Sequence, residues 1–67
     1  MKAFIARDSD GRLFLYSLNP PIKETTQWVI LDGRSDMFKI DDKLFPEVKW
    51  EDKEPTEINI EIVNKHQ

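Results

Sequence analysis

The sequence predicts one small, mainly β domain, built on an antiparallel sheet of four to five strands with one short helical turn near 42–45. Two observations lead to this fold class. Short segments rich in Phe, Ile, Leu and Tyr alternate with clusters of Gly, Pro, Asn and Asp, which is typical of strands joined by turns. A chain of 67 residues also has room for one domain only. A small α+β fold and a sheet curled toward a barrel stay open, because the pattern leaves the strand order undetermined.

The clearest element is a hairpin formed by residues 2–7 and 12–18, joined by a turn at 8–11. Gly11 suits the left-handed position that closes a type I turn with a bulge. The resulting register pairs Ala6 with Phe14, Ile5 with Leu15, and Phe4 with Tyr16. One face of the hairpin then carries Phe4, Ala6, Phe14 and Tyr16, and the other carries Ile5, Leu13 and Leu15. Because both faces are apolar, the hairpin needs cover on both sides.

The middle of the chain predicts a second antiparallel pair of strands. Residues 19–21 end the preceding strand, because their prolines donate no hydrogen bond to a ladder. Residues 22–27 are expected to form a polar loop, and 28–31 a short apolar strand. The tight-turn signal at 32–33 predicts that 34–40 returns antiparallel to that strand.

The next segment predicts a helical turn and another short strand. Asp41 or Asp42 is placed to cap one helical turn over 43–45, which Pro46 stops. A short strand is expected at 47–50, and a charged loop follows it.

The last predicted strand, 57–63, shows the cleanest alternation in the chain. Its core-facing positions are Ile58, Ile60 and Ile62, and its water-facing positions are Glu57, Asn59 and Glu61. If this strand lies at a sheet edge, its ladder invites pairing with another chain, or its charges prevent that pairing. Both interpretations stay open.

The composition argues against catalytic and metal chemistry. The chain has no cysteine, so neither a disulfide nor a thiolate zinc site can form. Its single histidine, His66, lies next to the C-terminal residue, a poor place for a catalytic base. The run from Asp8 to Gly11 resembles part of a calcium loop, but the end positions that need carboxylates would be Ala6 and Ser17. We therefore predict no enzyme activity, no metal site and no cofactor.

The formal net charge of −3 arises in the C-terminal part of the chain, where residues 41–67 contain eight acidic and four basic side chains. A basic footprint for phosphates is missing, so nucleic acid is not the expected partner. An alternative nucleic-acid role stays open in two forms, stacking of bases on the aromatic side chains and mimicry of DNA by the acidic half. No targeting segment or membrane-spanning stretch is visible, so the cytoplasm is the expected compartment.

The function that the sequence favours is protein interaction through a complementary surface. A hairpin apolar on both faces, in a chain with little core, favours binding of a protein partner or formation of a homodimer. The candidate interaction surface consists of Phe14, Tyr16, Trp28, Trp50, Ile58 and Ile60. Core packing is the usual role of such aromatics. Among the four aromatic residues of this surface, Tyr16 and Trp28 are expected to be the most exposed.

Two stretches carry a family resemblance: IARDSDGRLFLY at 5–16 and LFPEVKWEDKEPTEI at 44–58. Together they resemble a group of short uncharacterised proteins encoded in gut-bacterial and phage-like mobile genomes. The likeness covers nearly the whole chain, with residues 17–43 matching least. It implies a compact, stand-alone protein of mobile-element origin. It implies no activity and transfers no functional residue.

Overall fold

The computed structural model describes residues 1–31 and 33–61, and these residues form six strands in two antiparallel sheets. The main sheet has the strand order β5-β2-β1-β6 and consists of β1 (Lys2–Arg7), β2 (Leu13–Ser17), β5 (Met37–Ile40) and β6 (Thr56–Asn59). The smaller sheet pairs β3 (Ile22–Lys23) with β4 (Trp28–Val29). The predicted mainly β fold with an antiparallel sheet is therefore confirmed.

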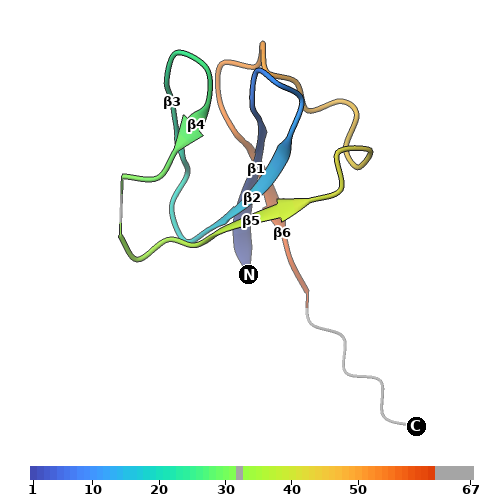
Figure 1. Ribbon diagram of the computed structural model, residues 1–67. Helices are drawn as coiled ribbons and strands as arrows, with labels where there is room; N and C mark the ends of the chain where they lie inside the picture. The colour runs from blue at the N-terminus through green and yellow to red at the C-terminus, as the bar shows by residue number, and fades with distance from the viewer. Residues whose placement is uncertain (32, 62–67) are drawn as a thin grey trace, which may run out of the picture.

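The main sheet is open rather than closed. Figure 1 shows it at the centre of the molecule, with the β3–β4 hairpin on one side and the long connection from β5 to β6 on the other. Strands β5 and β6 are its two edges over the described residues, and they do not pair with each other. The alternative of a sheet curled into a barrel is wrong for this part of the chain.

The β1–β2 hairpin has the predicted turn and register. Gly11 has a φ of 93°, in the left-handed region that glycine adopts without steric cost. Its N–H donates to the carbonyl of Asp8 (3.0 Å), and the N–H of Asp8 donates to the carbonyl of Arg12 (2.9 Å). The pairs Phe4–Tyr16, Ile5–Leu15 and Ala6–Phe14 follow as predicted.

Each face of the hairpin buries its own apolar cluster. The first face carries Phe4, Ala6, Phe14 and Tyr16, which pack against Trp28 from β4 and against Ile30 and Trp50. The second face carries Ile5 and Leu13, which pack against Val48 from the long connection, with Leu15, Ile40 and Ile58 at the border. Burying one large apolar side chain contributes roughly 1.5–3 kcal/mol, so both faces stabilise the fold. The need for cover on two sides is therefore met within this chain, by the segment around β4 with Trp50 on the first face and by Val48 on the second.

The predicted pairing of 28–31 with 34–40 is wrong. Residues 22–27, expected to be a polar loop, begin with β3, and β3 is the strand that pairs with β4. Strand β5 pairs instead with β2, where Phe38 lies opposite Leu15 and Ile40 opposite Leu13. This pairing places the apolar residues of β5 beside those of the second face of the hairpin, which favours it over pairing with 28–31. The tight-turn signal falls partly on Asp32, outside the described residues.

The predicted helical turn at 43–45 and the strand at 47–50 are also wrong. The chain forms consecutive β-turns here, closed by bonds from the Leu44 N–H to the Asp41 carbonyl (3.0 Å) and from the Val48 N–H to the Phe45 carbonyl (2.9 Å). Phe45 has a φ of 49°, which a right-handed helix cannot continue. Asp41 still binds a backbone N–H through its side chain, that of Lys43 at 2.9 Å, but it shapes a turn rather than a helix.

The last strand is an edge strand of the main sheet, the position that both sequence interpretations of its ladder assumed. Strand β6 pairs with β1 so that Ile58 lies opposite Ala3, and the N–H of Ile60 extends the ladder to the carbonyl of Met1 (2.6 Å). Ile58 and Ile60 are half-buried, and Glu57 and Asn59 are exposed. The predicted alternation is confirmed for these residues, whereas Ile62 lies outside the described residues.

Candidate interaction surface

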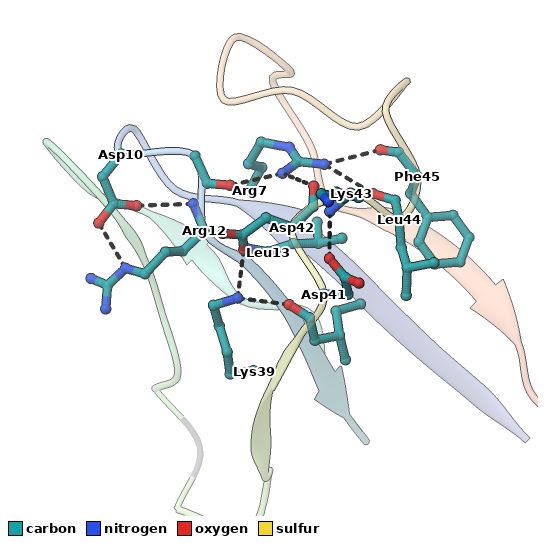
Figure 2. Close-up of polar contacts among 12 residues, drawn as sticks. Arg7, Asp10, Arg12, Leu13, Lys39, Asp41, Asp42, Lys43, Leu44 and Phe45 are labelled. Atoms are coloured by element: carbon teal, nitrogen blue, oxygen red, sulfur yellow. Dashed lines mark hydrogen bonds and ion pairs between the residues drawn. The ribbon is translucent and has the colours of Figure 1, made fainter.

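The long connection is held on the second face of the sheet by Arg7, the last residue of β1. Its guanidinium donates only to backbone carbonyls, and Figure 2 shows several of these bonds. Nε donates to Val48 (2.7 Å), Nη1 to Gly11 (2.8 Å) and Asp42 (2.9 Å), and Nη2 to Leu44 (3.1 Å) and Phe45 (3.2 Å). Each nitrogen of the planar guanidinium is thus used to organise turns. Sequence reasoning missed this residue, although strand alternation places its charge on the same face as Ile5.

Asp42 joins the loop to the ends of β2 and β5. Its Oδ1 accepts hydrogen bonds from the N–H of Leu13 (3.3 Å) and from Nζ of Lys39 (Figure 2). The bond from Lys39 holds the pKa of the Asp42 carboxyl below its ordinary value. The ammonium of Lys39 also donates to the carbonyl of Ile40 (2.7 Å), so this side chain folds back on its own strand.

Beyond the part covered by Val48, the second face exposes apolar side chains from three strands. We call this surface the open face; it consists of Leu15, Phe38, Ile40, Ile58 and Ile60. Phe38 is 53% exposed, and the other four are half-buried. Within the four strands of the sheet, Arg7 is the only charged residue on this face, and loop carbonyls bind it. Leu44 and Phe45, both exposed, lie in the loop at its end.

Most of the predicted surface residues are not at the surface. Phe14, Tyr16 and Trp28 are buried on the first face, so the prediction that they contact a partner is wrong. Trp50 is half-buried and meets Trp28 edge to face, with ring centroids 6.4 Å apart. Only Ile58 and Ile60, of the six predicted residues, belong to the open face.

Tyr16 and Trp28 are buried because their polar atoms find partners inside the protein. The N–H of Trp28 donates to Oδ1 of Asp8 (2.9 Å), and its indole Nε1 donates to the carbonyl of Arg7 (3.1 Å). The hydroxyl of Tyr16 lies 3.5 Å from the carbonyl of Trp28. Burial, together with the negative charge of Asp8, raises the pKa of Tyr16 to about 12. The expectation that these two aromatics are the most exposed is therefore wrong.

Lys23 covers one face of the ring of the remaining tryptophan, Trp50. Its ammonium lies 4.1 Å from the ring centroid of Trp50 and 5.5 Å from that of Trp28, as in cation–π pairs. The same Nζ donates to the carbonyls of Trp50 and Asp52. This indole face is occupied by the protein's own cation and is not free to stack on a base.

Sequence reasoning missed three residues of the open face, Leu15, Phe38 and Ile40, of which Phe38 is the most exposed. Ser35 and Asp36 weaken the alternation of the segment 34–40, which was expected to pair with 28–31. The exposure of Phe38 depends on the position of β5, which pairs with β2 at the edge of the sheet. The sequence signal for that pairing is the match between the apolar positions of β5 and the second face of the hairpin.

The rest of the described structure offers no enclosed site. Residues 1–31 and 33–61 form no pocket, and they contain no group of three or more His, Asp or Glu side chains that could bind a metal ion. They also form no helix that is long and apolar enough to span a membrane. Comparison of the chain with protein-family models, curated proteins and solved structures finds no match. The resemblance to short proteins of mobile genomes stays a prediction.

Proposed function

We propose that this protein is a non-catalytic interaction domain that binds a partner protein through the open face. The observation that supports this function best is the exposure of Phe38, a large aromatic side chain that is 53% accessible on the edge strand β5. We place the interaction in the cytoplasm, because a chain without cysteine suits a reducing compartment.

The character of the surface supports a protein partner. An antiparallel sheet that packs one face on a core normally carries polar residues on the other face. Here the first face carries a buried apolar cluster, and the second face is also apolar. Protein interfaces are apolar and poor in charge at their centre, with aromatic residues as anchors. We assign Phe38 the role of such an anchor, since burying the exposed half of a phenylalanine stabilises a complex by roughly 1 kcal/mol.

The nucleic-acid alternative receives less support. A stacking platform needs exposed aromatics surrounded by free cations. Phe14, Tyr16 and Trp28 are buried, and Lys23 covers Trp50. The guanidinium of Arg12 lies 2.7 Å from the Asp10 carboxylate, which reduces its availability to a phosphate.

Affinity capture from native host extract tests the proposed function. The tagged wild type is compared with Phe38→Glu, which places a charge at the centre of the open face. Leu31→Glu serves as the matched control, because Leu31 is 74% exposed and lies outside the main sheet. We expect one partner to be retained by the wild type and by Leu31→Glu, and to be lost with Phe38→Glu. Circular dichroism confirms that each variant is folded, and retention by folded Phe38→Glu would contradict the proposal.

A further inference from the structure

Strand β5 has a free hydrogen-bonding edge. The N–H of Ser17 donates to the carbonyl of Asp36 (3.0 Å), which shows that this pair faces inward between β2 and β5. Because the backbone groups of successive residues in a strand point to opposite sides, those of Phe38 and Ile40 also point to β2. The N–H and carbonyl groups of Met37 and Lys39 therefore point away from the sheet. In the described part of the chain, β5 is the last strand on that side.

This edge has little of the usual protection. Natural proteins guard an edge strand with charged side chains, proline, bulges or a covering loop. The single charged residue of β5 is Lys39, and its ammonium is turned back toward Asp42 and the Ile40 carbonyl (Figure 2). Met37 is 47% exposed on one face of the strand, and Phe38 is 53% exposed on the other. The free backbone groups are thus flanked by apolar side chains on both faces.

We propose that β5 pairs antiparallel with β5 of a second copy of this chain, about a two-fold axis that passes beside Phe38. Met37 of each copy then lies opposite Lys39 of the other, and each of these two pairs exchanges two backbone hydrogen bonds. All outward-pointing backbone groups of β5 are used in this register. The two main sheets become one continuous sheet.

The side chains select this register and this occupant. The two Phe38 residues form a non-hydrogen-bonded pair with Cα atoms about 4.5 Å apart, so their rings meet on the open face. A register centred on Lys39 would instead place like charges directly opposite each other, which is unfavourable. The arrangement uses the same surface on both copies, so it closes as a dimer and leaves no free β5 edge.

The other edge of the sheet is less suited to pairing. The outward-pointing residues of β6 are Glu57 and Asn59, by the same alternation. Both have exposed polar side chains, and the carboxylate of Glu57 lies 3.8 Å from the ammonium of Lys2. Charged and polar groups of this kind discourage strand addition.

The inference goes beyond the proposed function, although both involve Phe38. Edge pairing leaves Leu15, Ile40, Ile58 and Ile60 of each copy on the same side of the joined sheet. The dimer therefore presents two open faces next to each other, which enlarges the surface available to a partner protein.

Sedimentation equilibrium tests the dimer with proline variants of the two edges. Met37→Pro removes an outward-pointing N–H and keeps all internal ladder bonds, since proline is tolerated at such edge positions. Glu57→Pro makes the same change on β6 and is the matched control. We expect the wild type and Glu57→Pro to dimerise, and Met37→Pro to raise the dissociation constant about tenfold or more, from two lost hydrogen bonds per dimer. A wild type that stays monomeric up to millimolar concentration would overturn the inference.

Cysteine cross-linking tests the register independently of proline. The chain contains no cysteine, so a single introduced thiol reports only on contacts between copies. The Cα separation expected at the axis lies within the range that a disulfide spans. We expect Phe38→Cys to form a disulfide-linked dimer under mild oxidation, and Ile58→Cys on β6 to remain largely monomeric. Equal rates of cross-linking in these two variants would overturn the proposed pairing.

The two proposals fail in different ways. A monomeric wild type whose capture of a partner still depends on Phe38 would remove the dimer and leave the proposed function intact. A dimer that is weakened by Met37→Pro, with no partner captured, would support the dimer and contradict the proposed function.

Discussion

Arg7 shows how one side chain can shape a loop that has no regular secondary structure. Its hydrogen bonds reach carbonyls up to 41 positions along the chain, and no carboxylate takes part in them. A guanidinium provides five N–H donors in one plane, whereas the ammonium of lysine provides three around a point. The turns that place Val48 against the core therefore depend on arginine in particular.

We predict that Arg7→Lys lowers the free energy of unfolding by about 2–4 kcal/mol, because several charge-assisted hydrogen bonds are lost. Arg12→Lys is the control: its side chain is 57% exposed and paired with Asp10, so the expected change is below about 0.5 kcal/mol. Urea denaturation measures both values. Similar stability losses in the two variants would show that Arg7 does not organise the loop.

Tyr16 makes the stability of the protein sensitive to alkaline pH. Its pKa is raised to about 12 in the folded protein, from an ordinary value of 10.0 that applies when the chain unfolds. Between these values the unfolded state has released a proton that the folded state retains, so stability falls as pH rises through the window from 10 to 12.

We predict that the tyrosinate absorbance of the native protein appears with a midpoint near pH 12 or only upon unfolding. Tyr16 is the only tyrosine, so the signal belongs to it alone. The Tyr16→Phe variant removes this ionisation, and its stability should depend less on pH above 10. A midpoint near 10 in protein that still shows native circular dichroism would mean that the hydroxyl is solvated.

At the scale of elements, the β1–β2 turn depends on the backbone of one glycine. Gly11 has a φ of 93°, and a Cβ built on it would meet no atom within 4 Å. A substitution there therefore strains the backbone without causing a clash. Gly33 also has open space around it, but its φ does not lie in the left-handed region.

We predict that Gly11→Ala destabilises the protein by about 1–2 kcal/mol, the cost of holding alanine at positive φ. Gly33→Ala should change the free energy of unfolding by less than about 0.5 kcal/mol or increase it slightly, because alanine restricts the unfolded chain. Chemical denaturation of the two variants checks the difference. Equal effects would mean that the turn tolerates alanine and adopts another type.

A strand is easier to predict from the sequence when the strand that it pairs with lies nearby in the chain. The β1–β2 hairpin is closed by a four-residue turn, so turn chemistry and alternation are sufficient to set its register. Strand β5 had two possible neighbours with apolar patterns, the nearby β4 and the more distant β2. Its pairing with β2 depends on the match of Phe38 and Ile40 to Leu15 and Leu13, which becomes visible only when the whole sheet is assembled.

At the scale of the whole molecule, two small clusters on opposite faces of one sheet replace a single large core. Trp28 is the residue that links the β3–β4 hairpin to the first face, through its ring and through two hydrogen bonds. A domain of this size has a total stability of only about 3–5 kcal/mol. Loss of one such contact is then comparable to the stability of the whole fold.

We predict that Trp28→Ala is largely unfolded at room temperature, since truncating a buried tryptophan costs about 3–5 kcal/mol. Trp50→Ala should remain folded with a lowered thermal midpoint, because Trp50 is only half-buried and lies at the border of the same cluster. Far-ultraviolet circular dichroism during heating distinguishes the two. A cooperative native transition in Trp28→Ala would show that the second face alone can maintain the fold.

The sequence by itself determined the mainly β class, the hairpin with its register, the two apolar faces and the alternation of Ile58 and Ile60. These features rest on contacts between near neighbours and on turn residues, whose conformational preferences act locally. Only the tertiary structure decided that β5 and β6 are the edges, that Phe14, Tyr16 and Trp28 face inward, and that Arg7 holds a loop without helix. Each of these depends on which distant groups satisfy a buried polar atom or cover an apolar face, and local sequence preferences do not specify such partners.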